Sequence, residues 1–248
     1  MGSLFESLPI FSFFRHIFSR RAKIIKTAKT LQDHLTLKRP ILKMETQNSK
    51  PQQLNLVVKA YQISVFLKLI ESGFKLRIQT GLSIRELFCD QLGISSDYFE
   101  NRLQTIFCDG KPVDNVDTCQ VHNGARIAIS AAMPGLVGAV FRKGGQYASF
   151  RRCISHSETG NSAEKGEGGI VLKFFNMIKK ELGPAFLKKG VTIEGGRFRD
   201  FLLRNSEDLN ADCRSLHLND EKTKVSALLK MNWENTEVFL RVTQEKSA

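Results

Sequence analysis

Five cysteines and five histidines are the residues of this 248-residue chain most suited to nucleophilic or metal chemistry. A cysteine nucleophile needs a nearby histidine or helix N-terminus that lowers the pKa of its thiol. Cys153 lies three residues before His156 among arginines, so it is the one thiol to test, with a structural role as the alternative. Cys108 and Cys119 fall in or beside predicted strands, where buried, unreactive thiols are typical. The histidines lack metal-ligand spacing, and no phosphate-binding or nucleophile-elbow motif occurs. We therefore predict no catalytic residues, no metal site, no cofactor and no enzymatic activity.

Composition narrows the class of protein further. The hydrophobic fraction of 42% and charged fraction of 25% are those of a globular protein. No run of 18 apolar residues occurs, so we expect no transmembrane segment. The odd number of cysteines and the absence of a C-x-x-C pair favour reduced thiols and a cytoplasmic location. The net charge is +12, but nine of the Lys and Arg residues lie in residues 1–43. This uneven distribution argues against specific nucleic-acid binding.

Residues 1–53 form a basic leader whose boundaries are set by composition. The segment is rich in Phe and then in Lys and Arg, and it contains few acidic residues. Such a pattern allows residues 1–30 to contact a membrane surface, or to serve as a transit peptide. A start of translation at Met44 rather than Met1 is the alternative.

Elements able to position a site follow in residues 54–131. Ser83 and Glu86 form a capping box that opens a helix through about Leu92. Ser72-Gly73 separates two apolar runs and predicts a hairpin turn. The predicted strands are Val65–Glu71, Phe74–Thr80, Leu103–Phe107 and Ala125–Ala131. The apolar run Leu54–Ala60 either adds a short strand or leads into the hairpin.

Two polar or glycine-bearing stretches accompany these strands as candidate binding sites. The first is a turn, Asp109, Gly110, Lys111 and Pro112, which can act as a recognition loop, although turn chemistry alone explains its composition. The second is a tail after the last strand, whose glycines lack a Cβ and can enter a narrow channel. The alternative is a surface loop that packs Leu136 and Val137 onto the sheet. The tail comprises Met133, Pro134, Gly135, Leu136, Val137, Gly138, Arg142, Lys143, Gly144 and Gly145.

A second unit is predicted after a linker rich in Gly, Ser and Glu at residues 155–169. Its elements are a strand at Ile170–Phe175, a short helix that stops at Gly183-Pro184, a strand around residues 190–193, a helix near Arg197–Arg204, and strands at Ser215–Asn219 and Thr236–Thr243. This unit repeats the order strand, strand, helix, strand, strand.

That order, with the glycine-bearing tail, resembles the β-grasp (ubiquitin-like) superfamily. The runs "IFCDGKPVDNVDT" and "VHNGARIAIS" look like the small sulfur carriers of molybdopterin and thiamine biosynthesis, and "RKGG" is similar to the end of ubiquitin. The run "VLKFFNMIKKELG" with "VTIEGGRFRDFLL" resembles the molybdopterin-synthase small-subunit family. The resemblance implies a terminal glycine carboxylate that is adenylated, and a protein partner such as an E1-like adenylating enzyme or a synthase subunit.

We therefore expect an α+β protein of two β-grasp units in tandem, at residues 54–154 and 170–248, joined by a flexible linker at 155–169. The first functional hypothesis is a sulfur-carrier-like or ubiquitin-like protein that works through its tail. The alternative is a non-catalytic protein-interaction module that keeps the fold without carrier chemistry. Gly144-Gly145 is internal here, so a carrier would need cleavage of the chain after Gly145.

Overall fold

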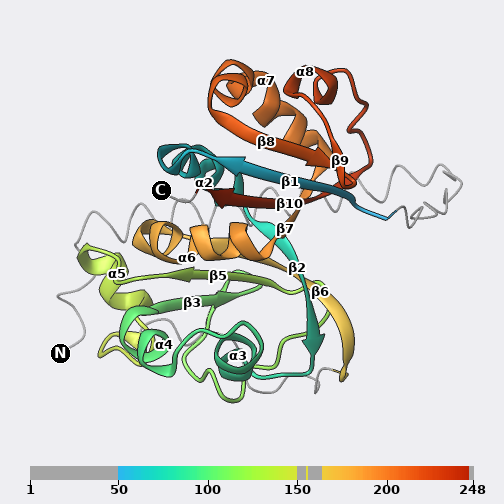
Figure 1. Ribbon diagram of the computed structural model, residues 1–248. Helices are drawn as coiled ribbons and strands as arrows, with labels where there is room; N and C mark the ends of the chain where they lie inside the picture. Colours follow the sequence, from blue (N-terminus) through green and yellow to red (C-terminus); the bar gives the residue numbers. More distant parts are fainter. Residues whose placement is uncertain (1–49, 150–154, 156–163, 246–248) are drawn as a thin grey trace, which may run out of the picture. The chain divides into compact units, whose positions relative to one another are not determined.

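The computed structural model describes residues 50–149, 155 and 164–245, which fall in one compact unit, Ser49–Ala248 (Figure 1). The leader up to residue 49, together with Cys153 and His156, lies outside the described residues. Ten strands form one mixed sheet in the order β4-β3-β5-β6-β2-β7-β10-β1-β8-β9. The chain is thus a mixed α/β protein, in agreement with the predicted α+β class.

The sheet divides into two halves, which we name half A and half B. Half A contains β2 (Phe74–Thr80), α3 (Ile84–Glu86), the π-helical turn η2 (Leu87–Gln91), α4 (Ser96–Arg102), β3 (Thr105–Cys108), β4 (Lys111–Pro112), β5 (Arg126–Ser130), α5 (Gly135–Phe141), β6 (Gly166–Phe174) and α6 (Asn176–Lys189). Half B contains β1 (Gln52–Val58), the 3-10 turn η1 (Ala60–Gln62), α2 (Ile63–Glu71), β7 (Val191–Glu194), α7 (Gly195–Asp212), β8 (Cys213–Leu218), β9 (Glu221–Lys222), α8 (Val225–Leu228) and β10 (Glu237–Gln244).

Both halves have the same pairing pattern. A parallel pair lies in the middle of each, β5 with β6 in half A and β1 with β10 in half B. Antiparallel strands flank each pair: β3 and β2 in half A, β8 and β7 in half B. The halves join where β2 meets β7, at the single pairing of Lys75 with Thr192.

The chain passes between the halves rather than completing one before the other. It makes β1 and α2 of half B, then all of half A, and then returns for β7 to β10. Residues 166–169 of the predicted linker belong instead to β6, which begins at Gly166 and pairs with β2, whereas residues 156–163 lie outside the described part of the chain. Glycine is needed in this strand, since a Cβ on Gly168 would lie 2.6 Å from Cγ2 of Thr80. The start of β6 is therefore rich in glycine, which is why its composition suggested a linker.

The predicted hairpin around Ser72-Gly73 is wrong, because its first strand is helix α2. Phe66, Leu67 and Ile70 are buried on one face of this helix. Gly73 adopts φ +109°, a value that glycine reaches easily, and turns the chain from α2 directly into β2. The second predicted strand, Phe74–Thr80, is confirmed as β2.

The predicted end of a helix at Gly183-Pro184 is also wrong, because α6 continues to Lys189. A Cβ on Gly183 would lie 2.4 Å from Cδ2 of Leu67, so this glycine permits close packing of α6 against α2. Phe186 in the last turns of α6 packs against Phe74 and Phe174 of the sheet, with ring centroids 5.8 and 5.0 Å away. Helix α6 lies against half A and also contacts β10, as Figure 1 shows.

Other predicted elements are confirmed, among them β1, β3, β5, β7, β8 and β10. The capping box is also present: Ser83 N–H donates to Oε2 of Glu86 at 2.7 Å, and Glu86 N–H donates to Oγ of Ser83 at 3.2 Å. The tandem β-grasp relationship of the two units stays a prediction.

Arg197, in the first turn of α7, holds the entry of β2. Its Nη1 donates to the carbonyl of Gly73 at 2.7 Å, and its Nη2 donates to the carbonyl of Leu69 at 2.9 Å and to Oγ of Ser72. Burial lowers the pKa of the guanidinium. A helix of half B thus fixes the crossing from α2 to β2, close to the point where the halves join.

Candidate functional site

The predicted tail is largely helical. Residues Gly135–Phe141 form α5, and Gly135 has φ +74°. A Cβ on Gly138 would lie 1.9 Å from the carbonyl oxygen of Met133, so the helix packs closely on the residues before it. Leu136 is exposed, which does not fit a loop that packs this residue on the sheet. The ring of Phe141 instead contacts Phe107 of β3, with centroids 5.4 Å apart.

The basic and diglycine end of the tail is bound to half A. Lys143 N–H donates to the carbonyl of Gln104 at 2.7 Å, and Gly144 N–H donates to Oδ1 of Asp114 at 3.3 Å. The Lys143 ammonium lies 3.2 Å from Oε2 of Glu100 and 4.9 Å from the ring centroid of Phe99. Only 14% of this side chain is exposed. The diglycine is therefore part of a folded surface in the intact chain.

The predicted turn is a tight hairpin between β3 and β4. Asp109 and Gly110 have φ values of +50° and +78°, which suit a two-residue hairpin loop. Lys111 and Pro112 belong to β4 rather than to the loop. Phe107 connects turn and tail, because it pairs with Pro112 and contacts the ring of Phe141 at the end of α5.

A contact between a carboxylate and an imidazole supports the turn. Oδ2 of Asp109 accepts from Nε2 of His122 at 2.7 Å, and Oδ1 accepts from the Arg126 N–H at 2.8 Å. Burial opposes ionisation of Asp109, but these two donors outweigh it and lower the pKa of the carboxyl. The pKa of His122 is raised by its hydrogen bond to the Asn123 carbonyl and by Asp109. These contacts explain the turn as a structural feature.

Cys108 and Cys119 share a hydrogen bond, which raises the pKa of the Cys108 thiol and lowers that of the Cys119 thiol. Cys108 and Cys119 are buried, as predicted. A hydrogen bond with Cys119, together with burial, raises the pKa of Cys108 far above its usual value and keeps this thiol protonated. Among the described residues, no group of three or more His, Cys, Asp or Glu side chains could hold a metal ion.

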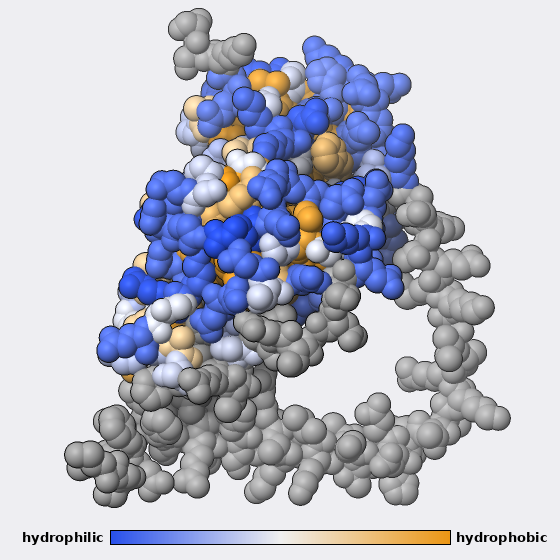
Figure 2. Space-filling view, turned by 90° about the horizontal axis from the view of Figure 1, so that it is seen from below, coloured by the Kyte–Doolittle hydropathy of each residue, from blue (hydrophilic) through white to orange (hydrophobic). Residues whose placement is uncertain are grey.

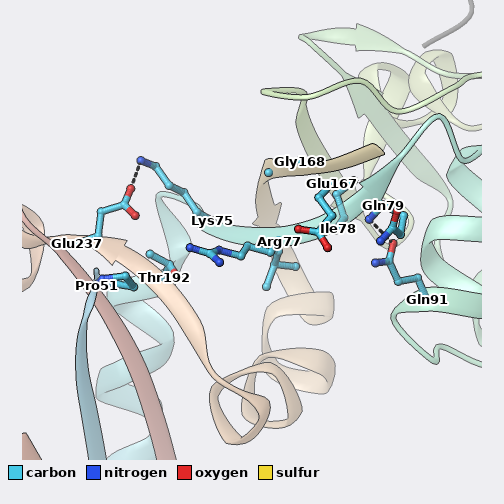
Figure 3. A pocket seen from close by; sticks show the side chains of 12 residues that line it. Pro51, Lys75, Arg77, Ile78, Gln79, Gln91, Glu167, Gly168, Thr192 and Glu237 are labelled. Atoms are coloured by element: carbon cyan, nitrogen blue, oxygen red, sulfur yellow. Dashed lines mark hydrogen bonds and ion pairs between the residues drawn. The ribbon is translucent and has the colours of Figure 1, made fainter. Parts of the chain in front are cut away.

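A groove of about 610 Å³ opens where the two halves of the sheet separate (Figure 3). We call it the β2 groove. It is formed mainly by β2, the start of β6, and single residues of β7 and β10. Its lining residues are Pro51, Lys75, Leu76, Arg77, Ile78, Gln79, Gln91, Glu167, Gly168, Gly169, Thr192 and Glu237.

The groove exists because β2 and β7 diverge after their one pairing at Lys75. From Leu76 onward, β2 has a strand partner only on the β6 side within the described part of the chain. The residue of β6 opposite Arg77 is Gly169. Its N–H donates to Oδ1 of Asn123, and its carbonyl accepts from the N–H of Gly124. Arg77 and Gly169 are therefore a pair without mutual hydrogen bonds, and the backbone groups of Arg77 point into the groove.

Residues two apart on a strand direct their backbone groups to the same side, so those of Gln79 also point into the groove. Its N–H points into the groove and donates to the side-chain Oε1 of Gln91 at 3.2 Å. The N–H and carbonyl of Arg77 have no such cap among the described residues. A short stretch of open strand edge is thus present inside a ten-stranded sheet.

The charged side chains of the groove differ in how they are paired. Lys75 binds Oε1 of Glu237 at 2.5 Å across the join of the two halves. Arg77 reaches along the groove toward Thr192 (Figure 3), and neither Arg77 nor Glu167 has an ion-pair partner in the described residues. One cation and one carboxylate are therefore available to a ligand.

One face of the molecule is largely polar. On the face seen in Figure 2, hydrophobic residues form small separate patches among hydrophilic ones. Within the described ranges, no helix has the length and apolar character needed to cross a membrane.

The groove residues were missed at the sequence level, whereas the predicted tail and turn lie elsewhere in half A. A signal is present in FKLRIQT, where polar Lys75, Arg77 and Gln79 alternate with buried residues and mark the outer face of a strand. It does not indicate that β7 leaves this strand after one pairing. Comparisons with protein-family models, with curated proteins and with solved structures found no match to this chain.

Proposed function

We propose that this chain is a non-catalytic protein-interaction module that keeps a β-grasp-like arrangement and does not act as a sulfur carrier. The shared pairing pattern of the two halves supports a relationship between them. The β2 groove offers such a module open backbone groups and charged side chains.

The state of the diglycine segment carries this proposal. A carrier requires a free glycine carboxylate that can enter an adenylation site. Here Lys143 and Gly144 are hydrogen-bonded to Gln104 and Asp114 of half A. Cleavage after Gly145 would also place β5 and β6, which are neighbours in the sheet, on separate pieces of chain. Loss of the second piece would take β6 out of the sheet between β5 and β2.

Two measurements test the proposal. Intact-mass analysis of the protein from its own cells should give no species that ends at Gly145. Selection of phage-displayed nine-residue random peptides on the full chain should enrich a defined set of sequences. A major species ending at Gly145 would support carrier chemistry and refute the module. Failure to enrich any peptide would also refute it.

A further inference from the structure

Strand edges inside proteins are usually paired or covered, because an open edge can accept another strand. The edge of β2 that faces the groove is an exception. The N–H and carbonyl of Arg77 and the carbonyl of Gln79 point into the groove and lack backbone partners in the described part of the chain. This donor and these two acceptors belong to a strand that is already paired with β6, so they need not be ordered when a ligand binds.

The spacing of these groups fits an extended peptide. Along a strand, residues two apart are about 6.6–6.8 Å from each other and direct their backbone groups to the same side. Arg77 and Gln79 are such a pair. One extended segment can therefore hydrogen-bond with both residues, and its carbonyl can replace the side chain of Gln91 on the Gln79 N–H.

The charged side chains of the groove indicate which residues the bound segment should carry. The Arg77 side chain is exposed, lies in the groove and has no carboxylate partner among the described residues. Lys75, in contrast, is already paired with Glu237. Glu167 belongs to β6, on the side of β2 away from the open edge, so it lies one strand farther from an added strand. An acidic side chain next to Arg77 is thus favoured over a basic one.

We propose that the β2 groove binds an extended segment of a protein partner as an added strand on β2, with an acidic residue next to Arg77. Recognition by strand addition obtains affinity from main-chain hydrogen bonds and specificity from alternate side chains. This inference rests on the proposed interaction function and adds the site, the binding mode and the chemistry of the partner.

The test uses the peptides enriched on the full chain by phage selection. They should share an acidic residue at one position. Arg77→Glu should weaken the binding of a synthetic copy, measured by fluorescence anisotropy, by at least about tenfold, because one charge-assisted hydrogen bond is lost and the new carboxylate repels the acidic residue. A peptide with Lys in place of the acid should recover most of that loss on the variant. Lys111→Glu, an equal charge change on strand β4, is the matched control and should alter binding less than about twofold.

Two further readouts separate strand addition from simple charge attraction. N-methylation of the peptide amide that meets the Arg77 carbonyl should abolish binding, and the bound peptide should slow hydrogen exchange of the Arg77 amide. Charged residues also protect strand edges against aggregation. Arg77→Glu keeps that protection, so a loss of binding reports recognition.

The outcomes distinguish this inference from the function it rests on. Enriched peptides that lack an acidic residue, or that bind Arg77→Glu as tightly as the parent chain, would overturn the β2 site and leave the interaction module intact. Absence of enriched peptides would overturn both.

Discussion

Replacing Arg197 with Met should remove the link between α7 and the start of β2. The Met side chain keeps much of the aliphatic volume but donates no hydrogen bond. The carbonyls of Leu69 and Gly73 then lose the donors that lie 2.9 and 2.7 Å away. The positive charge near the C-terminus of α2 is also lost.

The size of the effect follows from these losses. A buried carbonyl without its donor costs about 1–3 kcal/mol. Arg197 is half-buried, so water can reach part of the site and the lower part of that range applies to each carbonyl. The favourable charge at the helix end contributes about 0.3–1 kcal/mol more. We expect the free energy of unfolding to fall by about 2–4 kcal/mol, or by roughly 5–15 °C in Tm for a domain of this size.

Urea titration followed by circular dichroism measures this change. Arg199→Met is the control, because its 3.4 Å contact with Glu234 joins two side chains that are 51% and 69% exposed. It should cost less than about 0.5 kcal/mol, as is usual for surface pairs. If Arg197→Met cost no more than this control, the three hydrogen bonds would not hold the entry of β2, and the reasoning would fail.

Two other predictions concern half A. Gly168→Ala should destabilise the chain by about 1–3 kcal/mol in urea titrations, because the new Cβ would lie 2.6 Å from Thr80. Gly169→Ala is the control and should be tolerated, because the nearest atom to its Cβ would be 3.6 Å away. Equal effects of the two substitutions would contradict this packing. The raised pKa of His122 means that the protonated imidazole stabilises the fold, so the urea midpoint should fall as pH rises above the ordinary value of 6.5, and His122→Ala should lack this loss. An unchanged slope in the variant would exclude His122 as its source.

Local patterns predicted most strands, but they missed helix α2 and ended helix α6 too early. The sequence ISVFLKLIE of α2 is apolar and β-branched enough to suggest a strand. Its buried residues, however, have the i, i+3, i+4, i+7 spacing of a helix, which was the signal to follow: Ile63, Phe66, Leu67 and Ile70. In α6, Gly183-Pro184 is a strong local stop signal. Tight contact of Gly183 with Leu67 makes the glycine useful inside the helix.

The candidate site was hidden for a different reason. Lys75 and Arg77 are visible as polar positions of a strand, but the groove depends on where β7 leaves β2. That divergence results from pairing between segments more than 100 residues apart in the chain. The diglycine was visible as a motif, while its binding to Gln104 and Asp114 depends on the folded half A. Sequence reasoning identified residue types well and their neighbours poorly.

The passage of the chain between the halves has a consequence during protein synthesis. Strand β1 emerges from the ribosome first, but its partners β8 and β10 emerge last, with about 180 residues between Val58 and Glu237. At about 5–20 residues per second, β1 waits roughly 10–40 seconds for β10. The strands of half A are contiguous and can pair as soon as β6 appears. During that time the apolar strand β1 lacks its partners, and the nascent chain is exposed to aggregation.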